Sequence, residues 1–286
     1  MVGTIATMES VAITLFPFLL VIVAICCSFC DANSNVLCIE SERNALLKFK
    51  NDLVDPSNRL SSWVEGGDCC KWLGVVCHNS TGHINQLHLA APLPVPHFDA
   101  PVAEWEAYHR SKNNSPLRGK IISSLLELKH LSSLDLSNNN FSSIQIPNFF
   151  GNLLSGEIPD CWNHWRRLGY LDLENNNLTG QIPPSLGHLN PSVLNLRNND
   201  MFGELPSTLQ HSTSLIMLDL SDNHFSGSVP AWIGDKLSKL EILSLRSNNF
   251  NGHIPQKICQ LQSLRILDLD NNNISGSIPK LVEYQY

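Results

Sequence analysis

Cysteine is the residue type in this sequence with the clearest capacity for chemistry. The chain of 286 residues has nine cysteines, and Cys38, Cys69, Cys70 and Cys77 lie within forty residues of one another. Such a cluster could bind zinc, but structural zinc sites usually use separated pairs of C-x2-C type. We therefore expect two disulfides, for which four cysteines leave three connectivities open.

No recognisable catalytic pattern accompanies these cysteines. The sequence lacks G-x-S-x-G, H-E-x-x-H, phosphate-loop and dinucleotide-binding motifs, and its eleven histidines are scattered without ligand spacing. The net charge is −7 and only 16% of the residues are charged, so no basic field exists for a nucleic acid. We predict a protein that is not an enzyme, uses no cofactor and binds no nucleic acid.

The first 32 residues predict delivery to the secretory pathway. Residues 11–30 carry no charge and precede a small-residue zone near Ala32, as in a cleaved signal peptide. The apolar run is also long enough to span a bilayer, so an uncleaved signal anchor stays open as the one direct membrane link. Both alternatives place the remainder in an oxidising compartment. Cleavage would remove Cys26, Cys27 and Cys30.

A repeat of about 24 residues explains the composition, which includes 43 leucines and 29 asparagines. The tripeptide Leu-x-Leu starts at Leu171, Leu194, Leu218, Leu243 and Leu267, at intervals of 23, 24, 25 and 24 residues. Earlier copies start at Leu87 and Leu134. The shared frame is LxxLxLxxNxLxGxIPxxL, and recurrence at this length predicts a stack of similar coils.

Each position of the frame has a mechanical interpretation. Alternation around the two leucines predicts a half-buried strand with the leucines inward, so the coils build a parallel sheet. An inward amide three residues later can bond main-chain groups of its own coil and the next. Glycine permits a bend, and proline fixes φ at the turn. The amides are those of Asn139, Asn176, Asn199, Asn223, Asn248 and Asn272.

These motifs resemble the plant-specific class of leucine-rich repeat, whose marker is the GxIP segment. The resemblance implies an α/β-type repeat solenoid, a curved superhelix with parallel strands on its concave face. Residues 33–80 resemble the N-terminal cap of plant receptor-like proteins. Within them Leu46, Phe49 and Leu53 fall on one helical face that ends at Asp55-Pro56, which predicts a short amphipathic helix closing the end of the solenoid. That likeness implies the pairs Cys38–Cys69 and Cys70–Cys77.

The repeats, over residues 81–280, are interrupted twice. Residues 90–118 form an insertion that we expect to be an extruded loop, with Trp105 and Tyr108 as candidate contacts. Half a repeat is missing near residues 151–152, which suggests an internally shortened relative of the family. Residues 281–286 follow as a tail without a closing cap, which suggests C-terminal truncation.

Cys161 and Cys259 cannot pair with each other in this frame. They lie four coils apart, about 19 Å at strand spacing, whereas a disulfide needs Cα atoms within about 7 Å. The resemblance implies that each would bridge to an adjacent coil, but neither expected mate is present in the sequence.

Outward strand positions are the candidate ligand contacts. Charges there can pair across adjacent strands, as for Glu174 with Arg197 and Arg246 with Asp270, or accept a peptide or protein. The candidates are Tyr170, Asp172, Glu174, Asn195, Arg197, Met217, Asp219, Ile242, Ser244, Arg246, Asp268 and Asp270. Glycosylation sequons occur at Asn79, Asn113, Asn140, Asn177 and Asn273.

The family resemblance also implies a function. The sequence is similar to plant receptor-like proteins that recognise microbial xylanase or effector proteins and signal through a partner kinase. We therefore expect a defence-related, non-catalytic binding protein at the plasma membrane or in the apoplast, with a microbial or endogenous ligand. The alternatives are a secreted protein similar to polygalacturonase inhibitors and a truncated fragment or decoy that does not signal.

Overall fold

The computed structural model describes residues 37–91, 115–145 and 162–279. The predicted signal segment, the broken half-repeat near residues 151–152 and the tail at 281–286 lie outside these ranges. Among the described residues, no helix is long and apolar enough to cross a membrane.

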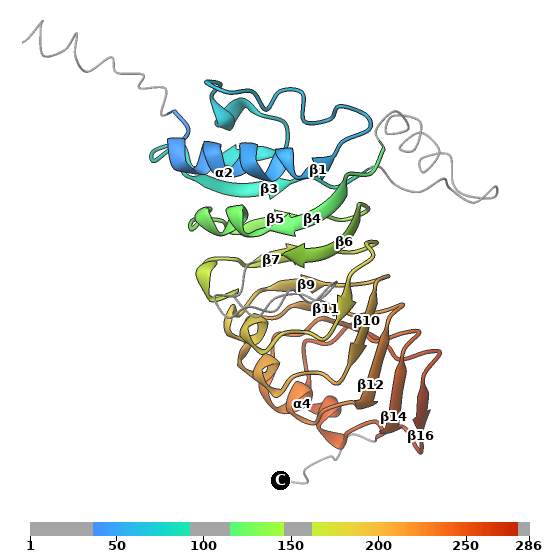
Figure 1. Ribbon diagram of the computed structural model, residues 1–286. Helices are drawn as coiled ribbons and strands as arrows, with labels where there is room; N and C mark the ends of the chain where they lie inside the picture. The colour runs from blue at the N-terminus through green and yellow to red at the C-terminus, as the bar shows by residue number, and fades with distance from the viewer. Residues whose placement is uncertain (1–36, 92–114, 146–161, 280–286) are drawn as a thin grey trace, which may run out of the picture. The chain divides into compact units, whose positions relative to one another are not determined.

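Seven parallel strands stack in the order of the seven Leu-x-Leu motifs, as predicted (Figure 1). An antiparallel strand, β2, pairs with β3 and completes an eight-stranded sheet. The strands are β2 (Val75–Cys77), β3 (Ile84–His88), β5 (Ser133–Asp135), β7 (Tyr170–Asp172), β9 (Val193–Asn195), β11 (Met217–Asp219), β13 (Ile242–Ser244) and β15 (Ile266–Asp268).

A second parallel sheet, which the repeat pattern did not predict, covers another side of the coils. Its strands are β8 (Thr179–Gly180), β10 (Asp200–Gly203), β12 (His224–Ser228), β14 (Asn249–His253) and β16 (Asn273–Ser275). Each contains or directly precedes the glycine of the frame, and Gly203 and Gly227 have φ of 91° and 83°. Glycine is needed there because other residues resist that conformation within a strand.

Short helices form the convex side, between the second sheet and the next strand of the first. They are η2 (Ser123–Glu127), η3 (Trp162–His164), η4 (Pro184–His188), η5 (Ser207–His211), α4 (Trp232–Lys236) and η6 (Gln256–Gln260). Pro183, Pro206 and Pro255 precede η4, η5 and η6 with φ between −61° and −68°, as the frame predicts. Neighbouring helices pack closely, since a Cβ added to Gly234 would overlap the backbone of Lys257.

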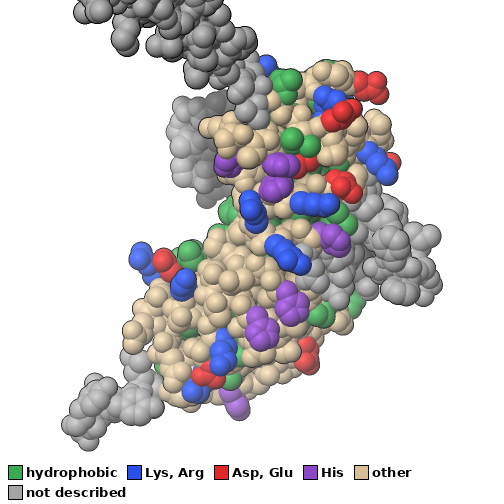
Figure 2. All heavy atoms as spheres, turned by 90° about the vertical axis from the view of Figure 1, so that its left-hand side faces the viewer, with side chains coloured by type: hydrophobic (Ala, Val, Ile, Leu, Met, Phe, Trp, Pro, Cys, Tyr) green, Lys and Arg blue, Asp and Glu red, His purple; other side chains and the backbone are tan. Residues whose placement is uncertain are grey.

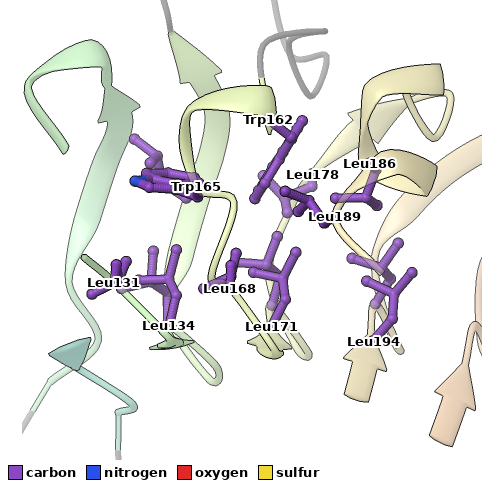
Figure 3. Close-up of a cluster of buried hydrophobic side chains, with 14 of the residues drawn as sticks. Leu131, Leu134, Trp162, Trp165, Leu168, Leu171, Leu178, Leu186, Leu189 and Leu194 are labelled. Atoms are coloured by element: carbon purple, nitrogen blue, oxygen red, sulfur yellow. The ribbon is translucent and has the colours of Figure 1, made fainter. Parts of the chain in front are cut away.

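The core lies between the strands and these helices. Leu134, Leu171 and Leu194 point inward from three neighbouring strands, toward Trp162 and Trp165 (Figure 3). The two indoles meet edge to face with ring centroids 5.2 Å apart. Each coil buries only part of its apolar surface against itself, so stacking completes the core.

The predicted asparagine amides bond within their own coil and to the preceding coil, rather than to the next. Asn223 Nδ2 donates to the carbonyls of Leu220 and Leu196, and its Oδ1 accepts the N–H of Met201. The residue just before each such asparagine has a positive φ, as Asp222 does at 54°. Asparagine tolerates this left-handed region better than most residues, which explains the asparagine doublets.

The N-terminal cap consists of α2 (Glu40–Asn51), β1 (Leu53–Val54) and η1 (Cys69–Lys71). The helix buries Leu46 and Phe49, as predicted, but it ends at Asn51. Leu53, expected on the same helical face, instead lies in β1 and pairs with Gly119. Pairing with the first coil therefore ends the helix earlier than periodicity suggested.

A three-stranded sheet of β1, β4 (Arg118–Ile122) and β6 (Asn140–Gln145) joins the cap to the first coils. Leu117 is fully buried, and the N–H of Ala91 donates to the carbonyl of Ser137. Both ends of the expected insertion at 90–118 thus belong to the repeat. Trp105 and Tyr108 lie outside the described residues.

Candidate ligand-binding face

The candidate contacts lie in register on one face of the eight-stranded sheet. Asp172, Asn195, Asp219, Ser244 and Asp268 occupy equivalent positions on consecutive strands. Tyr170, Met217 and Ile242 share a second column, which also contains Val193, a residue that the sequence analysis did not single out. Val193 directly precedes the first leucine of the frame, and that position could have identified it from the sequence.

Most side chains of the column that begins at Asp172 accept hydrogen bonds from the backbone, so these acceptor atoms are already used within the protein. Asp172 Oδ1 accepts the N–H of Glu174 at 3.0 Å, and Asp219 and Asp268 accept the N–H two residues onward in the same way. Asn195 does so with its amide oxygen. These side chains close the turn after each strand, which is a common role for Asp and Asn.

Ser244 is the exception in this column. Its hydroxyl contacts that of Ser221 on the neighbouring coil, and the residue is buried. Asp172 and Asn195 are buried as well. The column therefore offers a ligand less surface than its outward position suggested.

Charged residues two positions further along are more exposed, and they pair across coils as one of the two interpretations predicted. Arg197 lies 3.9 Å from Glu174 and 3.2 Å from Asp222. Arg246 lies 3.0 Å from Asp270 and 3.7 Å from Asp268. About half of each arginine side chain remains accessible, so exposed pairs of this kind can exchange partners at little cost in free energy.

An apolar strip runs beside these charges. Val193, Met217 and Ile242 are half-buried neighbours in register, and Ile266 extends the strip with 52% exposure. Ile216, just before β11, is 42% exposed. Apolar side chains on a solvent-facing sheet surface beside charged residues are typical of a binding surface.

Tyr170 and Asp172 contact each other on β7, between β5 and β9. The Tyr170 hydroxyl donates to Asp172 Oδ2 at 3.2 Å. Burial, followed by the negative charges of Asp172 and Asp135, raises the pKa of Tyr170 to about 12. Burial also raises the pKa of Asp172, against the opposing hydrogen bond from the Glu174 N–H.

The cap contains the two disulfides that the family resemblance implied, Cys38–Cys69 and Cys70–Cys77, each with Cα atoms 5.4 Å apart. Three of these sulfurs lie close enough to hold a metal, but all four are bonded in disulfides. Among the described cysteines, Cys259 has a free thiol, 3.5 Å from the carbonyl of Pro279. Cys161 lies outside the described residues.

Four of the predicted glycosylation sequons are on the described surface. The asparagines Asn79, Asn140, Asn177 and Asn273 are all exposed. Three of them directly follow one of the inward amides and begin or precede a strand that lies outside the eight-stranded sheet. A glycan there would leave that face open. Asn113 lies outside the described residues.

Family comparisons agree with this architecture along much of the chain. The leucine rich repeat N-terminal domain matches residues 39–78. Leucine rich repeat families match residues 130–153, 167–189 and 213–274. The chain therefore contains a leucine-rich repeat N-terminal domain followed by leucine-rich repeats.

Relatives of this leucine-rich repeat protein include plant receptor-like proteins, as the sequence resemblance predicted. Receptor-like protein EIX1 of Solanum lycopersicum is 48% identical over 189 residues, which cover 61% of this chain and 17% of the relative. Receptor-like protein EIX2 of the same plant is 38% identical over 152 residues, 52% of this chain and 12% of the relative. The leucine-rich repeat protein thus spans a small part of the length of these relatives.

Solved structures similar to this leucine-rich repeat protein confirm the predicted solenoid. The PEPR1–AtPEP1 crystal structure has a TM-score of 0.65 and 31% identity, and covers 84% of this chain and 29% of that chain. The ectodomain of the Arabidopsis receptor kinase HAESA, in complex with an IDA peptide hormone, has a TM-score of 0.55 and 26% identity, and covers 86% of this chain and 43% of that chain.

Proposed function

We propose that this leucine-rich repeat protein is a non-catalytic, extracellular recognition protein that binds a peptide or protein on its eight-stranded sheet. The observation that carries this proposal is the in-register strip of Val193, Met217 and Ile242 beside the exposed charges of Arg197 and Arg246. Three consecutive coils thereby present an apolar and ionic surface to one extended partner.

The relatives support the choice of partner. The similar PEPR1 and HAESA structures are described with AtPEP1 and with a peptide hormone. A role in plant defence, with a microbial or endogenous ligand and signalling through a co-receptor kinase, extends the likeness to receptor-like proteins. The function of the relatives rests on whole chains that are much longer than this one.

A variant that introduces a charge, together with a matched control, tests the binding face. Peptides would first be selected on the secreted chain from a displayed random library. We expect their affinity to be lower by roughly tenfold or more for the Met217→Glu variant. Val64→Glu is the matched control, since Val64 is 52% exposed in the cap and lies outside the eight-stranded sheet. Peptides that bind all three proteins equally would contradict the proposal. Potent inhibition of a pectin hydrolase would instead favour the polygalacturonase-inhibitor alternative.

The extracellular location has its own test. Two disulfides and four exposed sequons suit an oxidising, glycosylating compartment. We expect the mature N-terminus, read by mass spectrometry, near Asn33, and glycosidase-sensitive mass on the exposed asparagines. An N-terminus at Met1 with membrane retention would support the signal anchor, and a protein without glycan in the cytosol would contradict the location.

A further inference from the structure

Basic side chains recur at one position of the convex helices. η3, η4, η5 and α4 each end in a basic residue. Lysine and arginine side chains also lie in the turns that follow η2 and η3. We define the basic band as the exposed residues Lys129, Arg166, Arg167, His188, His211 and Lys236. Figure 2 shows Lys, Arg and His side chains gathered along this face of the molecule.

The band contrasts with several exposed cations elsewhere in the protein. Arg197, Arg246, Arg265 and Lys257 each form an ion pair with a carboxylate. Within the described part of the chain, none of the lysines and arginines of the basic band does so. A column of exposed, uncompensated cations raises the local concentration of anions.

Carboxylates are kept away from this surface. Of the described acidic residues, only Glu127 and Asp235 lie on the convex helices at the two ends of the basic band, and Asp235 is paired with Lys257. The described ones between them belong to the strands or to the turns that follow the strands: Asp135, Asp172, Glu174, Asp200, Glu204, Asp219 and Asp222. A protein of net charge −7 thus has one side that is positive.

Helix stabilisation accounts for only part of this pattern. A basic residue in the last turn interacts favourably with the helix dipole, worth about 0.3–1 kcal/mol in ordinary helices. These helices have three to five residues, so the dipole is small. Arg166 and Arg167 lie beyond the end of η3, and nothing in helix stability requires two adjacent arginines there.

The periodicity of the band specifies a linear partner. Successive coils repeat at about the spacing of parallel strands, near 5 Å, so the cations form a row along the solenoid. The rings of His188 and His211 lie stacked, with centroids 6.2 Å apart and an angle of 13° between their planes. Asn190 is an exposed amide two residues after His188, and its Oδ1 accepts the N–H of Ser214. A row of cations with flat rings and hydroxyl-binding groups suits a polymer of acidic sugars.

We infer that the basic band binds an acidic polysaccharide, a linear polymer of carboxylated sugars, along the convex side of the solenoid. This surface is separate from the proposed peptide-binding face, and the choice of a polysaccharide over other polyanions rests on the proposed extracellular location. Binding is electrostatic, so it weakens as salt screens the charges.

Binding of fluorescent polygalacturonate to the secreted full chain tests the inference. We expect saturable binding at low ionic strength that is lost in about 0.5 M salt. Combining Arg166→Gln, Arg167→Gln and Lys236→Gln should weaken binding roughly tenfold or more. The control combines Lys48→Gln, Lys71→Gln and Arg265→Gln, an equal change in net charge at exposed sites off the band.

Several outcomes would overturn the inference. Equal losses in the two triple variants would show non-specific attraction to net charge, and unchanged binding in both would place the polymer elsewhere. Equal affinity for polyglutamate of matched charge would replace the polysaccharide with an acidic peptide. Because peptide binding is scored with Met217→Glu, the two surfaces fail or succeed independently.

Discussion

The guanidinium of Arg59, in the N-terminal cap, donates a hydrogen bond to the side-chain oxygen of Asn139 at 3.2 Å. It also donates to the carbonyls of Leu89 and Ala90, at 3.0 Å and 2.6 Å. Asn139 in turn donates to Leu89 and to Leu136 of its own coil. One cation of the cap therefore completes the hydrogen bonding of the first inward amide, and joins cap and solenoid into one network.

Replacing Arg59 should uncouple this network. We expect Arg59→Ala to lower the free energy of unfolding by about 2–3 kcal/mol, because buried carbonyls lose a charged donor. Denaturant midpoints measure the change. Arg265→Ala is the control, since that side chain is 77% exposed and should cost less than about 0.5 kcal/mol. Equal midpoints for the two variants would contradict the role of Arg59.

The inward amides predict a larger loss in the middle of the solenoid. Asn223→Ala removes donors to Leu220, Leu196 and Ser221 and the acceptor for Met201. We expect a loss of about 3 kcal/mol, since each buried group left unsatisfied costs about 1–3 kcal/mol. Asn251, on β14, is exposed, so Asn251→Ala should leave the denaturant midpoint nearly unchanged. An equally large loss of stability in Asn251→Ala would contradict the role of Asn223.

Asp172 should make stability depend on pH. Burial, with a contribution from Asp135, raises the pKa of Asp172 in the folded state. The folded protein therefore binds this proton more tightly than the unfolded chain does. The resulting stabilisation is complete below the unfolded pKa, about 4, and is lost as pH rises through the folded pKa.

Asp172→Asn should therefore raise the unfolding midpoint near pH 7 and leave it unchanged near pH 3. The asparagine oxygen can still accept the N–H of Glu174, as Asn195 does for Arg197 in the next coil. The reverse variant, Asn195→Asp, should lower the midpoint near pH 7, because it buries a second carboxylate beside Asp172. A stability gain from Asp172→Asn that is equal at both pH values would contradict this account.

The two disulfides should contribute unequally. Cys38–Cys69 closes a sequence separation of 31 residues and Cys70–Cys77 one of 7. Loop-closure entropy then makes loss of the first pair more costly by about 1 kcal/mol. Thermal unfolding of the double variants Cys38→Ser/Cys69→Ser and Cys70→Ser/Cys77→Ser measures the difference, and a greater loss from the second variant would reverse the expected order.

The outward residues of the sheet show which features periodicity predicts and which it does not. Periodicity placed Asp172, Asn195 and Asp219 correctly on one face, and it gave the pairing of Glu174 with Arg197. It could not show that the first three accept backbone N–H groups two residues onward. That bond depends on the turn after the strand, whose backbone angles the strand pattern does not contain.

The sequence by itself determined the solenoid, the inward leucines, the inward amides and the position of the cap, because all of these recur at a fixed period that one-dimensional spacing records. Only the tertiary structure decided that each amide reaches back to the preceding coil, that the glycine segments form a second sheet and that Arg59 closes the junction with the cap. These features depend on which backbone groups of neighbouring coils face each other across a few ångströms. Stacking, and not the spacing within one repeat, sets that relationship.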